Sequence, residues 1–261
     1  MPVIARTLEG RSCRAWAAAI LLTLATSCGS VFHTERETNL AFVLDKNEIV
    51  FPEASLNGSA GRFVLASALP QTVADPQALR RSGTASTLRI GEHFSTTVRP
   101  QTTDLHGLAD GLLGADAWRE NPVVIDYRSG LLTISPDSER PAGMPTFPFR
   151  RVPLVPLLVN GIEVNGIVDT TVPDTLVLPL TFSEDKRPGR GLVHVIMAGR
   201  TFRTDASFRD TDVVLIGNRL LANFVVFLDY KHGVVGLWPD VRGGGRAATA
   251  PAEPLPSPGR S

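Results

Sequence analysis

An aspartate followed by two hydroxyl residues offers the clearest chemistry in this sequence. Asp169, Thr170 and Thr171 come directly after the apolar pair Ile167-Val168. A positioned carboxylate can take a proton from water and so act as a general base. It can equally brace its own turn by accepting hydrogen bonds from neighbouring N–H groups, which is a purely structural role. Both interpretations of Asp169 stay open at this point.

The segment that must position Asp169 belongs to a pattern that occurs twice, 103 residues apart. Two gap-free blocks share this offset, which indicates an internal duplication. The matched residues are Asn57-Gly58 with Asn160-Gly161, Pro70 with Pro173, Thr72 with Thr175, Pro76 with Pro179, Leu112 with Leu215, Gly114 with Gly217, Val123 with Val226, Asp126-Tyr127 with Asp229-Tyr230, Gly130 with Gly233, and Pro136 with Pro239.

Each copy has the composition of short β-strands joined by turns. Apolar, β-branched runs bounded by glycine predict strands and hairpins. We expect strands at 64–65, 122–127 and 131–134, with counterparts at 167–168, 224–230 and 234–237, hairpins around Gly91 and Gly199, and one or two helical turns within 115–121 and 218–223. Trp118, Leu220 and Leu221 are predicted core residues. The polar stretch 137–143 is expected to link the copies.

The second copy resembles the aspartic proteases. Its Gly166-Ile167-Val168-Asp169-Thr170-Thr171 segment, followed by Val214-Leu215-Ile216-Gly217, is similar to that family's apolar strand, Asp-Thr-Gly turn and later hydrophobic pair with glycine. In the first copy Asp110-Gly111-Leu112-Leu113-Gly114 resembles the second motif. The resemblance covers about residues 48–239. It implies an all-β fold with two pepsin- or retropepsin-like β-barrel lobes, related by a pseudo-twofold axis, and a substrate cleft between them.

The composition along the chain, together with the extent of the resemblance, divides the chain into parts. We expect a signal peptide over 1–27, a tether over 28–45, a first lobe over 46–138, a second lobe over 147–240 and a disordered tail over 241–261. The predicted tail is rich in glycine, proline and alanine without a visible period.

The chemistry of the family needs two carboxylates about one water, one of them protonated and the other ionised. Here the sequence departs from the family. Asp169 corresponds to Ala66, and the first copy reads Ala66-Ser67-Ala68 where the family carries Asp-Thr-Gly. Ser67 keeps the hydroxyl of Thr170, so we expect a brace of the turn to survive. Thr171 and Ala68 each replace a glycine, which crowds the turn.

Three hypotheses follow from this asymmetry between Ala66 and Asp169. The first is a catalytically degenerate relative that binds extended peptide in the cleft. The second is a working aspartic-type endopeptidase in which Asp169 acts in an atypical site. The third is a structural envelope lipoprotein whose cleft is closed by its own loops. Asp75, Asp104 and Asp110 are out of register to replace the missing carboxylate.

The first thirty residues are typical of a bacterial lipoprotein signal. Arg6, Arg11 and Arg14 precede an apolar run of eleven residues, 15–25, which is short for a membrane span. Small residues then precede Cys28, and the resemblance implies cleavage before this cysteine and acylation of its thiol. We therefore expect a lipid-anchored protein of the cell envelope. Ordinary secretion and an uncleaved anchor are the alternatives.

Composition excludes several other classes. There are 26 basic and 26 acidic residues and no basic cluster, which argues against a nucleic-acid partner. Two cysteines, Cys13 and Cys28, are too few for a disulfide scaffold or a cysteine-rich zinc module. No cofactor or metal is expected. The five histidines (His33, His93, His106, His194, His232) have no zinc-motif spacing, although His93 and His194 could line the cleft.

Overall fold

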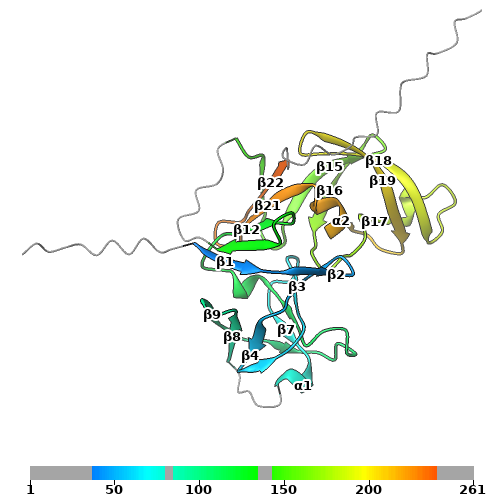
Figure 1. Ribbon diagram of the computed structural model, residues 1–261. Helices are drawn as coiled ribbons and strands as arrows, with labels where there is room; N and C mark the ends of the chain where they lie inside the picture. Colours follow the sequence, from blue (N-terminus) through cyan, green and yellow to red (C-terminus); the bar gives the residue numbers. More distant parts are fainter. Residues whose placement is uncertain (1–36, 80–84, 135–142, 240–261) are drawn as a thin grey trace, which may run out of the picture. The chain divides into compact units, whose positions relative to one another are not determined.

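The computed structural model describes residues 37–79, 85–134 and 143–239. The predicted signal peptide, Cys28 and the tail over 241–261 lie outside these residues, as does nearly all of the 137–143 linker. The described residues form two six-stranded sheets, one four-stranded sheet and one closed barrel, and Figure 1 shows their arrangement. The predicted all-β class with two related lobes is confirmed. No helix in the described ranges is long and apolar enough to cross a membrane.

A sheet shared by the two lobes carries the symmetry. Its strand order is β1 (Thr38–Ala41), β13 (Leu131–Ile134), β12 (Val123–Asp126), β21 (Phe224–Asp229), β22 (Val234–Pro239) and β14 (Thr146–Pro148). In the central antiparallel pair, Val123 lies opposite Leu228 and Ile125 lies opposite Val226. Val226 is the repeat counterpart of Val123, and Leu228 that of Ile125. A twofold rotation therefore maps this pair onto itself, and the register puts the pseudo-twofold axis between β12 and β21. Figure 1 labels both strands.

The first lobe distributes its strands over two sheets. One sheet has the order β10 (Gln101–Thr102), β7 (Val73–Ala74), β11 (Gly111–Leu113), β6 (Phe63–Leu65), β3 (Glu48–Phe51) and β2 (Val43–Asp45). The other has the order β5 (Ser59–Ala60), β4 (Ala54–Leu56), β8 (Ser86–Ile90) and β9 (Phe94–Val98). The short helix α1 (Pro76–Leu79) and the 3-10 turn η1 (Ala115–Ala117) complete this lobe.

The second lobe closes the corresponding strands into a barrel. Its order is β15 (Leu154–Val159), β16 (Ile162–Val168), β20 (Val214–Ile216), β17 (Leu176–Pro179), β19 (Arg200–Arg209) and β18 (Gly189–Met197), with the 3-10 turn η2 (Leu180–Phe182) and the helix α2 (Asn218–Leu221). The parallel pairing of Gly166 with Val214 repeats that of Phe63 with Gly111 in the first lobe. The predicted hairpins around Gly91 and Gly199 and the predicted helical turns are confirmed.

The repeated Asn-Gly pairs form matching turns in the two lobes. Asn57 and Gly58 have φ values of 50° and 79°, and Asn160 and Gly161 have values of 51° and 82°. Asparagine and glycine tolerate this left-handed conformation, which suits a two-residue hairpin turn. Each asparagine side chain also accepts a hydrogen bond from a neighbouring strand, at Thr87 and His194 respectively. The duplicated sequence therefore produces the same local structure twice.

The predicted tether over 28–45 is wrong for its last eight residues. Residues 38–41 and 43–45 are β1 and β2, which pair with β13 and β3. Leu40 and Phe42 are buried there, at 4% and 5% exposure. The prediction extended the polar character of residues 34–39 too far along the chain, since residues 40–44 (Leu-Ala-Phe-Val-Leu) are apolar. Leu40 and Phe42 are buried between exposed neighbours, as the alternation of a strand requires.

The shared sheet offers a direct stability test. Leu228 in β21 is fully buried, whereas Leu192 in β18 is 60% exposed. We predict that Leu228→Ala lowers the free energy of unfolding by about 2–5 kcal/mol, because the truncation leaves a cavity in the hydrophobic core. Leu192→Ala, the matched control, should change it by less than about 1 kcal/mol. Urea unfolding followed by tryptophan fluorescence measures both values. Equal losses would contradict the placement of Leu228 in the core.

Candidate functional site

Ala66 and Asp169 occupy equivalent positions at the ends of equivalent strands. Ala66 follows β6 and donates its N–H to the carbonyl of Leu113 at 2.9 Å. Asp169 follows β16 and donates its N–H to the carbonyl of Ile216 at 3.0 Å. Each donor lies 103 residues from its counterpart, as does each acceptor. Each turn is thus held by the same backbone hydrogen bond. It joins the end of the apolar strand to the later Leu-Leu-Gly segment in the first lobe and to the Leu-Ile-Gly segment in the second.

The two turns are joined by a reciprocal pair of hydroxyl groups, which we call the hydroxyl brace. Ser67 Oγ accepts the N–H of Thr170 at 3.0 Å and donates to the carbonyl of Val168 at 2.8 Å. Thr170 Oγ1 accepts the N–H of Ser67 at 3.0 Å and donates to the carbonyl of Leu65 at 2.7 Å. Each hydroxyl satisfies two backbone groups of the opposite lobe. The expected survival of a turn brace at Ser67 and Thr170 is thus seen, and it operates between the lobes.

Burial makes the hydroxyl brace energetically important. Ser67 is 1% exposed and Thr170 is fully buried. A hydrogen bond between neutral groups contributes only about 0.5–1.5 kcal/mol net, but a buried donor or acceptor left without a partner costs about 1–3 kcal/mol. Removal of either hydroxyl would leave an N–H and a carbonyl unpaired in the interface. The brace therefore fixes Ala66 and Asp169 beside each other.

The two oxygens of the Asp169 carboxylate differ in their contacts with the described residues. Its Oδ1 accepts the N–H of Thr171 at 2.9 Å and the Thr171 hydroxyl at 2.7 Å. Within the described residues no hydrogen bond reaches Oδ2. The side chain is partly exposed. Asp169 thus braces its own turn and still presents an oxygen that can accept a further hydrogen bond.

The opposite turn supplies no carboxylate. Ala66 is fully buried, and its methyl group can neither take nor give a proton. Two of the out-of-register aspartates are engaged elsewhere: Asp75 accepts the N–H groups of Gln77 and Leu105, and Asp110 accepts that of Arg62 at 2.6 Å. The third, Asp104, contacts His106 in an exposed loop. None of these contacts brings an acid to Asp169.

The repeated tyrosines support the two turns from across the interface. Tyr230, at the end of β21, donates its hydroxyl to the carbonyl of Ser67 at 3.0 Å. Burial raises the pKa of Tyr230, and the nearby charge of Asp169 raises it further, so the phenol stays a donor. Tyr127 is also buried, which raises its pKa, and it donates to Asn218 Oδ1 at 2.7 Å. Each tyrosine hydroxyl thus reaches the other lobe.

Asn218 completes the connection on the second lobe. Its Nδ2 group donates to the carbonyl of Thr170 at 2.6 Å and to the carbonyl of Asn47 at 2.7 Å. The first-lobe counterpart of Asn218 is Ala115, which has no polar side chain. Sequence reasoning missed this role, since the partners lie 48 and 171 residues away. The repeated tyrosine was the available signal for such a contact.

The glycine that ends each second motif is required by close packing. A Cβ atom at Gly217 would lie 2.1 Å from the carbonyl oxygen of Asp174, and one at Gly114 would lie 2.6 Å from that of Gln71. Real Cβ atoms do not approach an oxygen so closely. Gly114 and Gly217 therefore allow close contact with the backbone that follows the Ala66 and Asp169 turns, near Gln71 and Asp174 respectively. This shared packing explains why both copies of the repeat have glycine here.

The remaining candidates have structural or surface roles. Asp126 and Asp229 accept N–H groups of their own turns. His93, His106, His194 and His232 are exposed, and His33 lies outside the described residues. Trp118, Leu220 and Leu221 are core residues, with at most 2% exposure. In the ranges that the structure describes, no three His, Cys, Asp or Glu side chains gather as a metal site would require.

Three comparisons with known proteins were made, of families, curated sequences and solved structures. No protein-family model matches the chain. No curated protein matches it in sequence. Among solved structures, the chain is similar to a retropepsin-like aspartic protease from Rickettsia conorii, with 17% identity over 36% of this chain and 90% of that protein and a TM-score of 0.32.

The hydroxyl brace can be tested with an isosteric change. We predict that Thr170→Val lowers the free energy of unfolding by about 2–4 kcal/mol, because the Ser67 N–H and the Leu65 carbonyl lose their buried partner. Thr170→Ser keeps the hydroxyl and should cost about 1 kcal/mol for the lost methyl group. Chemical denaturation measures both. A Thr170→Val protein as stable as Thr170→Ser would show that the brace is energetically unimportant.

Proposed function

We propose that the chain is a catalytically degenerate, aspartic-protease-like lipoprotein that binds extended peptide segments between its lobes. One observation carries this proposal: the hydroxyl brace is intact in both turns, while only one turn has a carboxylate. The geometry of a paired site is kept without one of its two acids.

The missing acid argues against conventional proteolysis. In a two-carboxylate mechanism one group activates water while the other donates a proton to the substrate carbonyl. Asp169 can serve in only one of these roles at a time, and Ala66 can serve in neither. Removal of one member of a catalytic unit usually abolishes most of the rate.

The proposed peptide binding uses the one carboxylate that the site retains, that of Asp169. Asp169 Oδ2 can accept an N–H group from a ligand, since no described residue occupies it. A hydrogen bond to a charged acceptor contributes about 1.5–3 kcal/mol. Extended peptides pair their backbone with neighbouring strands and place alternate side chains in pockets. The hydroxyl brace holds the two turns in place before a peptide binds. The protein therefore loses little conformational entropy on binding, which favours affinity.

The N-terminal sequence supports a membrane location for the proposed binding protein. Cys28 follows a short apolar run and lies outside the described residues. We propose that its acylated thiol holds the protein in the bacterial cell envelope, on the periplasmic side or at the cell surface. Acyl chains of a lipidated N-terminus supply affinity of about 0.8 kcal/mol per buried methylene group.

The central test combines a cleavage assay with a binding assay on protein lacking residues 1–28. We predict that the protein shows no inhibitor-sensitive proteolysis: denatured casein at acid pH should not be cleaved by any activity that a statine-type inhibitor blocks. We also predict that the protein binds peptides from a casein digest. Asp169→Asn should weaken this binding by about tenfold, because a charged acceptor is lost. Asp205→Asn, at an exposed position in β19, is the matched control. Inhibitor-sensitive cleavage would overturn degeneracy, and failure to bind any peptide would overturn the binding role.

The anchor is tested in a bacterial host. We predict that the full-length protein incorporates a palmitate analogue and partitions with membranes, and that Cys28→Ala loses both properties. Cys13→Ala serves as the control and should retain both. Membrane association of Cys28→Ala equal to the parent would instead indicate an uncleaved anchor.

A further inference from the structure

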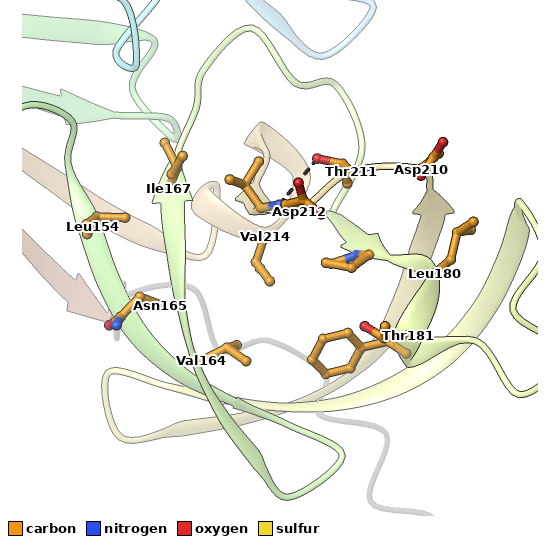
Figure 2. A pocket seen from close by; sticks show the side chains of 13 residues that line it. Leu154, Val164, Asn165, Ile167, Leu180, Thr181, Asp210, Thr211, Asp212 and Val214 are labelled. Atoms are coloured by element: carbon orange, nitrogen blue, oxygen red, sulfur yellow. Dashed lines mark hydrogen bonds between the residues drawn. The ribbon is translucent and has the colours of Figure 1, made fainter.

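The second-lobe barrel has a cavity whose lining includes neither Ala66 nor Asp169. Its volume is about 570 Å³, within the usual size range of ligand pockets. Figure 2 shows its walls. They consist of apolar side chains from β15, β16, β17 and η2, with a polar loop between β19 and β20: Leu154, Val164, Asn165, Ile167, Pro179, Leu180, Thr181, Phe182, Asp210, Thr211, Asp212, Val213 and Val214.

The barrel pocket adjoins the strand that ends just before Asp169. Ile167 lines the pocket and lies near the end of β16, whose last residue is Val168. Asp169 follows this strand, and its N–H bonds the carbonyl of Ile216 at the end of β20. Asp169 is not itself among the residues that line the pocket. The pocket and Asp169 therefore both adjoin the C-terminal end of β16.

The equivalent position in the first lobe is filled by the chain itself. Val64, the counterpart of Ile167, is 1% exposed and packs in a cluster with Val50 and Ala109, against which Leu105 lies. The plug comes from the connection between β10 and β11, which runs over residues 103–110. The corresponding connection in the second lobe runs over 210–213 only. Because this loop is shorter, Ile167 lines an open pocket, whereas its counterpart Val64 is covered by apolar side chains of the first lobe.

Charge at the rim indicates what occupies the barrel pocket. Asp210 and Asp212 stand on the loop along one rim, opposite Val164 and Asn165 (Figure 2). Both aspartates are exposed, and neither has a hydrogen-bond or ion-pair partner in the part of the chain that the structure describes. No Lys, Arg or His lines the pocket. An apolar wall beside two uncompensated carboxylates is complementary to a long side chain with a cationic end.

We propose that the barrel pocket binds a lysine or arginine side chain of an extended peptide, together with an adjacent apolar residue. The aliphatic stem lies against Ile167, Val164 and Phe182, and the cationic group lies between Asp210 and Asp212. This inference rests on the proposed peptide-binding function and specifies its ligand as a basic, apolar peptide segment. The first lobe offers no equivalent subsite, because its own loop fills the position.

The experiment compares three labelled, end-blocked peptides by fluorescence anisotropy: Ala-Leu-Lys-Leu-Ala, and the same sequence with Gln or Glu at the centre. We expect the Lys peptide to bind most tightly and its affinity to fall with added salt. The double variant Asp210→Asn/Asp212→Asn should lose about three- to tenfold in affinity for the Lys peptide, as exposed ion pairs contribute modestly. Asp205→Asn is again the control. Val164→Trp, which fills the pocket, should abolish the preference among the peptides.

The outcomes separate this inference from the proposed function. If casein peptides bind but the three short peptides bind alike, or the pocket variants leave the preference for Lys unchanged, the basic-side-chain subsite is overturned and peptide binding stands. If the Lys peptide binds in the barrel pocket while Asp169→Asn has no effect on casein peptides, the subsite stands and the role of Asp169 is overturned. If no peptide binds, both are overturned.

Discussion

The hydroxyl brace is the constraint on which the rest of this structure depends. Ser67 and Thr170 each satisfy two backbone groups of the other lobe in a fully buried interface. Buried backbone groups must be paired, so the two turns are held together whatever else the site contains. This explains how Ala66 can stand where an acid is expected while the architecture persists. Loss of the carboxylate removes chemistry, whereas loss of a brace hydroxyl would remove stability.

Three further contacts extend the same constraint outward. Tyr230 holds the Ser67 carbonyl directly, while Tyr127 holds the Thr170 carbonyl through Asn218. The β12–β21 pair, symmetric in register, carries both tyrosines at its ends. The asymmetry of the molecule is therefore concentrated in a few substitutions, such as Ala66 for Asp169 and Ala115 for Asn218, and in loop length. These differences give the symmetric architecture a site in which only the second lobe contributes a carboxylate.

Much of this could be predicted from the sequence, since duplication reveals long-range structure through local matches. The 103-residue offset predicted the equivalence of Ser67 and Thr170, and glycine-bounded apolar runs predicted the hairpins. Contacts without a repeated counterpart were not predictable. Asn218 pairs with residues far away in the sequence, β1 is polar at its start yet pairs with β13, and the barrel pocket arises from the absence of a plug. Each depends on tertiary packing, which a single segment does not encode.

A double-mutant cycle on the hydroxyl brace measures whether the two turns form one unit. Ser67→Ala, Thr170→Val and the double variant are compared by equilibrium unfolding. If the two hydroxyls act as one unit, the first change already loosens the turns, and the double variant should cost less than the two single losses added together, with a coupling energy of about 0.5–3 kcal/mol. Losses that add to within about 0.3 kcal/mol would show two independent turns, and would contradict a single braced site with an acid on one side.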